Sequence, residues 1–201
     1  EQKMKFPDRP GVHNGARILH PMYYPEHLYG HTASGRRFHE ELPVFEKAVA
    51  MWEEGNALMD RALALAPARK REAAGRLAGT GKFFGCGLRT CWHVKRWWLL
   101  NKRLEIEPDF ARAEAILDEL EAIARAEKKN VEAALPLAEA DSRLGWEPSM
   151  DYMADPWHLR WKLRQLDTLV RYTLKAYRTT LQKRPPIDPF SETGVSPTNS
   201  K

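Results

Sequence analysis

The sequence predicts an all-α protein, a bundle of about four long antiparallel helices preceded by an extended N-terminal strap. Apolar residues recur at helical spacing over most of residues 39–184, and prolines divide that region into long stretches. No stretch shows the alternation of apolar and polar residues that is typical of a half-buried strand. We therefore divide the chain into a strap (residues 1–38), a helical bundle (39–184) and a C-terminal tail (185–201).

The strap differs in composition from the rest of the chain. It holds four prolines, four glycines, three tyrosines and four histidines without a sustained period. Segments this long without secondary structure are uncommon in compact domains unless they are functional or disordered, and the aromatic content argues against disorder. We expect the strap to pack, extended, on this bundle or on a neighbouring domain. Two of its histidines, His20 and His27, are expected to contact substrate.

The first two helices are predicted from His39 to just before Pro67 and from Ala68 to Leu104. The first carries one apolar stripe, made of Val44, Phe45, Ala48, Val49, Trp52, Leu58, Met59, Ala62 and Leu63. The second contains a cluster of glycines at positions 75, 79, 81, 85 and 87. Because each glycine disfavours a helix by about 1 kcal/mol, the cluster indicates a close approach to another helix or a break near Thr80-Gly81.

The third and fourth helices have clear start signals. Residues 107–109 (Glu-Pro-Asp) and the pair Asp155-Pro156 place proline and acids where a first helical turn favours them. Pro136 is expected to kink or end the third helix, and Pro185-Pro186 to end the fourth.

The net charge of +5 is unevenly distributed. Residues 104–141 hold eleven acids and four bases, whereas residues 155–184 hold eight bases and two acids. Opposite charges on consecutive helices favour antiparallel neighbours that attract each other. We therefore predict that the basic helix faces its acidic partner and not nucleic acid.

Other features exclude further classes of protein. No apolar run approaches the ~20 residues that span a bilayer, so no membrane segment is predicted.

Cys86 and Cys91 are too few for a disulfide scaffold and, five residues apart on a helix, point to different faces, so buried thiols are expected. Two unpaired cysteines and no signal-like stretch slightly favour the cytoplasm, although the compartment stays open. A chain that begins Glu-Gln-Lys-Met looks like a processed product or a piece of a longer protein.

The connection between Asp141 and Asp155 is the most conspicuous candidate site. It carries the residues that we expect to bind substrate, namely Arg143, Trp146, Glu147 and Tyr152. Loops held by a rigid scaffold are a common place for function. Glu147 and Asp151 could act as paired carboxylates in glycoside hydrolysis. Two acids on one short loop more often form caps or ion pairs, for example Glu147 with Arg143, so no catalytic residue is assigned.

Residues 137–152 (Leu-Ala-Glu-Ala-Asp-Ser-Arg-Leu-Gly-Trp-Glu-Pro-Ser-Met-Asp-Tyr) and 158–165 (His-Leu-Arg-Trp-Lys-Leu-Arg-Gln) carry a family resemblance. With residues 90–100 and 20–27, they resemble the helical C-terminal region of large bacterial glycoside-hydrolase-like proteins, which are similar to α-glucuronidases and hexosaminidases. The resemblance implies that the catalytic carboxylates belong to a barrel that this sequence lacks. It also implies that exposed tryptophans cover the barrel or a second subunit.

Three functions follow as hypotheses. The first is a helical accessory domain of a carbohydrate-active enzyme, which packs on a catalytic domain and presents Arg143, Trp146 and Glu147 to a carbohydrate cleft. The second is a free-standing interaction or oligomerisation module with a tryptophan surface. The third is a small metalloenzyme that uses the strap histidines. Since no cysteine cluster, HExxH, P-loop or dinucleotide motif is present, we predict neither a metal site nor a cofactor.

Overall fold

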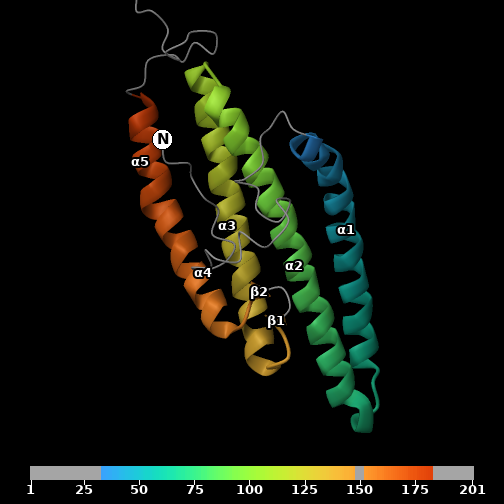
Figure 1. The fold of residues 1–201 in the computed structure, drawn as a ribbon. Helices are drawn as coiled ribbons and strands as arrows, with labels where there is room; N and C mark the ends of the chain where they lie inside the picture. Colours follow the sequence, from blue (N-terminus) through green and yellow to red (C-terminus); the bar gives the residue numbers. More distant parts are fainter. Residues whose placement is uncertain (1–32, 148–151, 183–201) are drawn as a thin grey trace, which may run out of the picture.

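The computed structural model describes residues 33–147 and 152–182, which form an all-α bundle of four long helices. The helices are α1 (Ala33–Ala64), α2 (Ala68–Ile106), α3 (Phe110–Ala140) and a fourth made of α4 (Pro156–Thr168), η4 (Leu169–Thr173) and α5 (Leu174–Gln182), which follow one another without a break. Helices adjacent in sequence are adjacent in space, so α1 lies at one edge and packs on α2 (Figure 1). The predicted fold class is confirmed.

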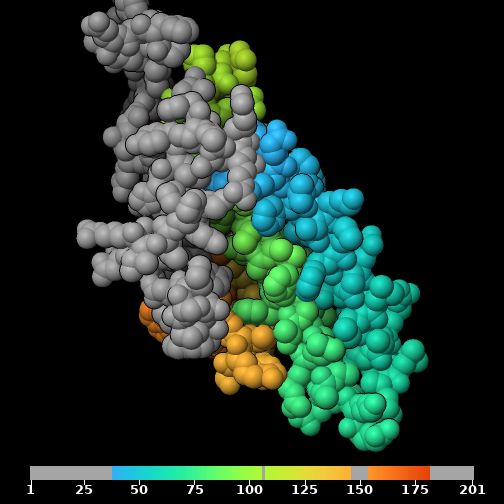
Figure 2. Space-filling model, turned by 45° about the vertical axis from the view of Figure 1, so that its right-hand side comes forward, coloured from blue at the N-terminus to red at the C-terminus, as the bar shows by residue number. Residues whose placement is uncertain are grey.

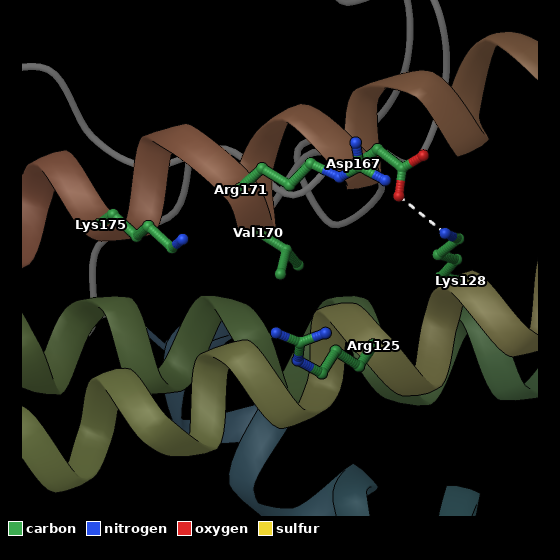
Figure 3. Close-up of a pocket in the computed structure, with 6 residues that line it drawn as sticks. All are labelled: Arg125, Lys128, Asp167, Val170, Arg171 and Lys175. Carbon is green, nitrogen blue, oxygen red and sulfur yellow. Dashed lines mark hydrogen bonds and ion pairs between the residues drawn. The ribbon is translucent and has the colours of Figure 1, made fainter.

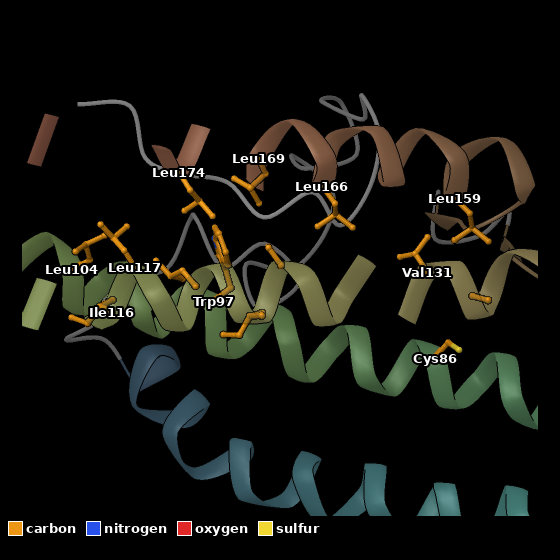
Figure 4. Packing of buried hydrophobic residues seen from close by; sticks show 14 of the residues in the cluster. Cys86, Trp97, Leu104, Ile116, Leu117, Val131, Leu159, Leu166, Leu169 and Leu174 are labelled. Atoms are coloured by element: carbon orange, nitrogen blue, oxygen red, sulfur yellow. The ribbon is translucent and has the colours of Figure 1, made fainter. Parts of the chain in front are cut away.

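The main hydrophobic core lies between α2, α3 and the fourth helix (Figure 4). Its most deeply buried residues are Leu117, Leu120, Ala124, Leu166 and Leu174. None of its buried residues belongs to α1. That helix instead contributes Phe38, which packs edge-on against Trp98 with ring centroids 5.1 Å apart. Adjacent Trp97 and Trp98 point to different sides of α2 and belong to different clusters, Trp97 to the main core and Trp98 to the contact with Phe38.

Two helix boundaries differ from the sequence prediction. α1 begins at Ala33, six residues before the predicted start at His39, so the end of the predicted strap is helical. Pro136 lies inside α3, which continues to Ala140, so the expectation that it could end the helix was wrong. The rest of the strap and the tail lie outside the described residues.

The glycines of α2 permit a close approach to α1. The helix runs unbroken through Thr80-Gly81, so the alternative of a break is wrong. A Cβ atom at Gly85 would lie 2.8 Å from Cδ1 of Trp52, closer than packed carbon atoms come. The indole Nε1 of Trp52 donates a 2.6 Å hydrogen bond to the carbonyl oxygen of Gly81. The glycines therefore leave the space on α2 into which the Trp52 ring packs.

Alanine substitutions at Gly85 and Gly87 are expected to have opposite effects. Gly85→Ala should lower the free energy of unfolding by about 1 kcal/mol, because crowding against Trp52 outweighs the gain in helix propensity. Gly87→Ala should raise it by about 1 kcal/mol, because nothing lies within 4 Å of the added methyl group. Urea unfolding at one chain concentration compares the variants. Equal stabilisation by both would contradict the close approach.

Ion pairs connect α3 with the fourth helix, as the charge distribution predicted. Lys128 bonds Asp167 at 2.7 Å, and Arg178 bonds Asp118 at 2.6 Å. Glu139 of α3 also pairs with Arg160. These exposed pairs are worth less than about 1 kcal/mol each, but they orient the two helices antiparallel. Along the described ranges no helix is both long and apolar enough to cross a membrane.

The fourth helix contains one π-helical segment, Leu169–Thr173. Before it, the buried positions Leu159, Lys162, Leu166 and Leu169 follow α-helical steps of three or four residues. The next buried residue is Leu174, five positions after Leu169. The wider turn therefore absorbs one extra residue and returns Leu174 to the core.

Candidate functional sites

The predicted loop site is held by a local ion pair. Arg143 donates from Nε and Nη2 to both carboxylate oxygens of Asp141, at 2.8 and 2.6 Å. Hydrogen bonds from the Arg143 side chain and backbone lower the pKa of Asp141 to about 2. The guanidinium thus binds Asp141, whereas the side chain of the expected partner Glu147 lies outside the described residues. This arrangement fixes the end of α3.

The loop returns through a short antiparallel ladder between β1 (Trp146–Glu147) and β2 (Tyr152–Met153), in which Glu147 is paired with Tyr152. Gly145 has a φ of +79°, and a Cβ there would lie 2.3 Å from the carbonyl oxygen of Ala154. Side chains of 146–153, and all of His20 and His27, lie outside the described residues. The predicted substrate contacts therefore remain predictions.

A buried polar network lies between the helices, and the sequence analysis did not predict it. The carboxylate of Glu127 on α3 is fully buried and accepts hydrogen bonds from four residues. Three donors lie at 2.6 Å, namely Thr90 Oγ1, Lys162 Nζ and the ring Nδ1 of His93, and Asn130 Nδ2 donates at 3.3 Å. His93 and Lys162 are themselves 3% and 5% exposed. The network thus joins α2, α3 and α4 around one negative charge.

The network extends to α1 through Asn130 and Arg89. Asn130 donates to the carbonyl oxygen of Cys86 at 2.9 Å and accepts from Arg89 Nη1 at 2.7 Å. The Nη2 atom of the same guanidinium bonds Glu53 of α1 at 2.7 Å. Arg89 therefore connects the edge helix to the buried carboxylate region.

The charge of Glu127 is stabilised by its surroundings. Burial raises the pKa of this carboxyl, but the ammonium of Lys162 and the hydrogen bond from His93 outweigh burial and lower the pKa to about 2. A buried ion pair with these hydrogen bonds fixes the relative positions of helices. The sequence did contain a sign that Glu127 is buried. It lies at helical spacing between Ala124 and Val131, at a position where an apolar residue is expected.

A shallow cleft opens at the surface between α3 and the fourth helix (Figure 3). Its volume is ≈ 170 Å³, and its lining residues are Arg125, Lys128, Asp167, Val170, Arg171 and Lys175. The Lys128–Asp167 ion pair closes one end. Arg125 bonds Glu121 outside the cleft. The cleft is therefore the solvent-facing margin of the ion-paired helix interface.

The ligand set for a metalloenzyme is not assembled in the described part of the chain. In residues 33–147 and 152–182, no three histidine, cysteine, aspartate or glutamate side chains form a group that could hold a metal ion. Neither cysteine forms a disulfide; Cys86 is buried, as expected, but Cys91 is exposed, so the prediction of two buried thiols was half wrong.

Exposed apolar residues gather on the hairpin of α1 and α2. Of the ten exposed large hydrophobic residues in the described part of the chain, seven lie on these helices or the turn between them. Six of them form what we term the hairpin face: Val44, Met51, Leu58, Leu65, Leu77 and Phe84, which are 54–85% exposed. Figure 2 shows α1 along the right-hand edge of the molecule. The edge position leaves this face open to solvent.

The apolar stripe predicted for α1 is in fact two stripes. Residues at positions 45, 49, 52, 56, 59 and 63 are turned toward α2, and they include buried Val49 and the Trp52 that packs on Gly85. Positions 44, 51 and 58 each precede one of these by one residue, or about 100° around the helix, and Leu65, the first residue after α1, continues their seven-residue spacing. The second stripe therefore lies beside the α2 contact.

Leu77 and Phe84 extend the second stripe onto α2. Each precedes by one residue a position that is turned toward α1, namely buried Ala78 and Gly85. Positions one residue later, such as Cys86, belong to the core with α3. Because α1 and α2 run in opposite directions, both exposed stripes lie on the same side of the hairpin, away from α3. The Trp52 and Phe84 rings, 4.6 Å apart, connect them.

Comparison of the chain with protein-family models, curated proteins and solved structures found no match.

Proposed function

We propose that this chain is a protein-interaction module that docks another polypeptide on the hairpin face. The observation that carries the proposal is the continuous row of exposed Val44, Met51, Leu58 and Leu65, each seven residues from the next. Exposed apolar residues scattered singly need no explanation, but a contiguous patch is a mark of an interaction site. A seven-residue repeat is the spacing with which a helix packs along another helix.

The rest of the fold supports this role. The interior of α2, α3 and the fourth helix is closed by its own apolar core and by the Glu127 network. α1 contributes no residue to the buried part of that core and is held to α2 through Trp52 and polar contacts such as Arg89 with Glu53. A partner that covers the hairpin face would give α1 a second apolar neighbour.

The accessory-domain function, which the resemblance implies, stays a prediction. It requires the same kind of surface, because a domain that packs on a catalytic barrel needs an open apolar face. The contribution of Arg143, Trp146 and Glu147 to a carbohydrate cleft, and binding of carbohydrate itself, also stay predictions. The pairing of Arg143 with Asp141 leaves one face of the guanidinium exposed, since its side chain is 70% accessible.

Site-specific photo-cross-linking tests the docking function. A photoreactive benzoylphenylalanine at Leu58, in the full chain and in the organism that encodes it, should give a discrete cross-linked protein. The matched control carries the same residue at Tyr172, an exposed aromatic position on the opposite edge of the helix row. We expect no discrete product there. Absence of a product at Leu58, or equal products at both positions, would contradict the proposal.

A further inference from the structure

We infer that the occupant of the hairpin face is a second copy of this chain, whose α1 packs antiparallel along the first. This inference rests on the proposed function and specifies the partner. The pattern of residue sizes along α1 carries the argument. The stripe alternates large side chains at 44, 51, 58 and 65 with small ones at 48, 55 and 62. The steps alternate between four and three residues, which is the 3.5-residue repeat of a coiled coil.

The two size classes complement each other in one antiparallel register. If the two-fold axis passes between positions 56 and 57, Leu58 lies opposite Gly55 of the second copy. Met51 then lies opposite Ala62, and Leu65 opposite Ala48, with the reciprocal contacts on the other side of the axis. Every large residue from 51 to 65 meets a small one. A parallel pair would instead set each large residue against its own copy and leave a gap at Gly55.

The charges beside the stripe favour the same register. Glu54 and Arg61 flank it on the side away from α2 and are exposed. Within the described residues, neither forms an ion pair. In the antiparallel register Glu54 of one copy lies opposite Arg61 of the other, and the two-fold symmetry makes this pair twice. On the opposite flank, Trp52 lies against Met59 of the second copy. The side-chain sizes, the charges and the apolar contacts therefore all favour the antiparallel register with its axis between positions 56 and 57.

The length of the stripe suits a helix-to-helix interface. In this register its paired part runs from Ala48 to Leu65, the first residue after α1, which is 17 residues or ~26 Å at ~1.5 Å per residue. Both copies use the same surface, so the contact closes on itself and gives a dimer without open-ended assembly. Glycine and alanine at alternate positions allow the two helix axes to approach closely.

Sedimentation equilibrium of the purified full chain tests the inference first. Between about 1 and 100 µM, a range that covers micromolar dissociation constants, we expect a species of twice the 23.2 kDa chain mass. Leu58→Lys should weaken association about 100-fold or more, because each dimer loses two buried leucines. Tyr172→Lys is the matched control and should leave the dimer unchanged. Circular dichroism verifies that both variants stay folded.

Charge reversal then tests the register. Glu54→Arg and Arg61→Glu should each weaken the dimer about 10-fold, because like charges meet twice. The double variant should recover most of the affinity. A parallel pair, or a dimer through another surface, would show no recovery.

Disulfide trapping gives an independent measure of the register. In a Cys91→Ser background, Met51→Cys chains mixed with Ala62→Cys chains should form a cross-linked dimer on mild oxidation. Neither chain alone should do so, because identical positions lie about 11 residues apart along the axis, ~16 Å. Cross-linking in the single-variant samples would overturn the register.

Failure of this inference is distinguishable from failure of the proposed function. A chain that stays monomeric at 100 µM, but gives a cross-linked product of foreign mass at Leu58, would overturn the second copy and leave the docking function standing. A monomer with no product at Leu58 would overturn both. A dimer that persists in Leu58→Lys would show that the copies meet elsewhere.

Discussion

Replacing Glu127 by alanine is expected to lower the free energy of unfolding by about 3–5 kcal/mol, the largest effect of any single substitution considered for this fold. The carboxylate is fully buried, and the ammonium of Lys162 lies 2.6 Å from it. Without Glu127, the buried side chains of Lys162 and His93 each lose the hydrogen bond that they donate to this carboxylate. Urea unfolding, followed by circular dichroism at a fixed chain concentration, measures the loss.

Two further variants separate charge from packing. Glu127→Gln keeps the shape of the side chain and should lower the free energy of unfolding by less than Glu127→Ala does, because an amide oxygen still accepts hydrogen bonds. The double variant Glu127→Met/Lys162→Met should be more stable than Glu127→Met alone, because it also removes the buried ammonium that has lost the Glu127 carboxylate. A loss below about 1 kcal/mol in Glu127→Ala would show that the network does not hold the helices.

Acidification is expected to remove about 3 kcal/mol of stability through Glu127 alone. Its pKa falls from an ordinary value of 4.5 to about 2 in the folded chain. The folded state therefore binds this proton less readily than the unfolded chain. The contribution is complete above about pH 5 and is lost progressively as the pH falls from 4.5 toward 2.

The Glu127→Gln variant isolates this pH effect. The free energy of unfolding of this variant should lie furthest below that of the unsubstituted chain near neutral pH. The difference between the two chains should shrink as the pH approaches 2. Other carboxyls, such as Asp155 and Asp167, also have lowered pKa values, but they are present in both chains and cancel in the difference. A deficit that is the same at pH 3 and pH 7 would contradict the lowered pKa of Glu127.

The helices could be predicted from the sequence because their signals are local. Asp155 caps α4 by accepting from the backbone N–H of His158, as the Asp155-Pro156 pair predicted. The early start of α1 at Ala33 depends on Phe38 packing against Trp98, 60 residues away. Pro136 stays within α3 because later contacts, such as buried Ala138, hold the helix beyond it. Long-range packing of this kind leaves no local signal.

The candidate surface was harder to predict than the fold. Val44, Phe45 and their neighbours were predicted to form one stripe, because both faces of α1 are apolar. Only the position of α2 shows that the stripe at 45 and 49 is covered and that the stripe at 44 and 51 is exposed. The loop around Arg143 attracted attention through its residue types. Its partner Asp141 lies two residues away, which the sequence also contained.

The π-helical turn at Leu169–Thr173 has a consequence for how this protein tolerates changes in length. The turn holds one residue more than an α-helical repeat requires, and Arg171 within it is exposed. Deleting that residue would convert the turn to regular α-helix and still place Leu169 and Leu174 on the core side, now four positions apart. An insertion there would rotate Leu174 out of the core. Homologous chains that differ in length by one residue in this helix should therefore carry the gap at this turn.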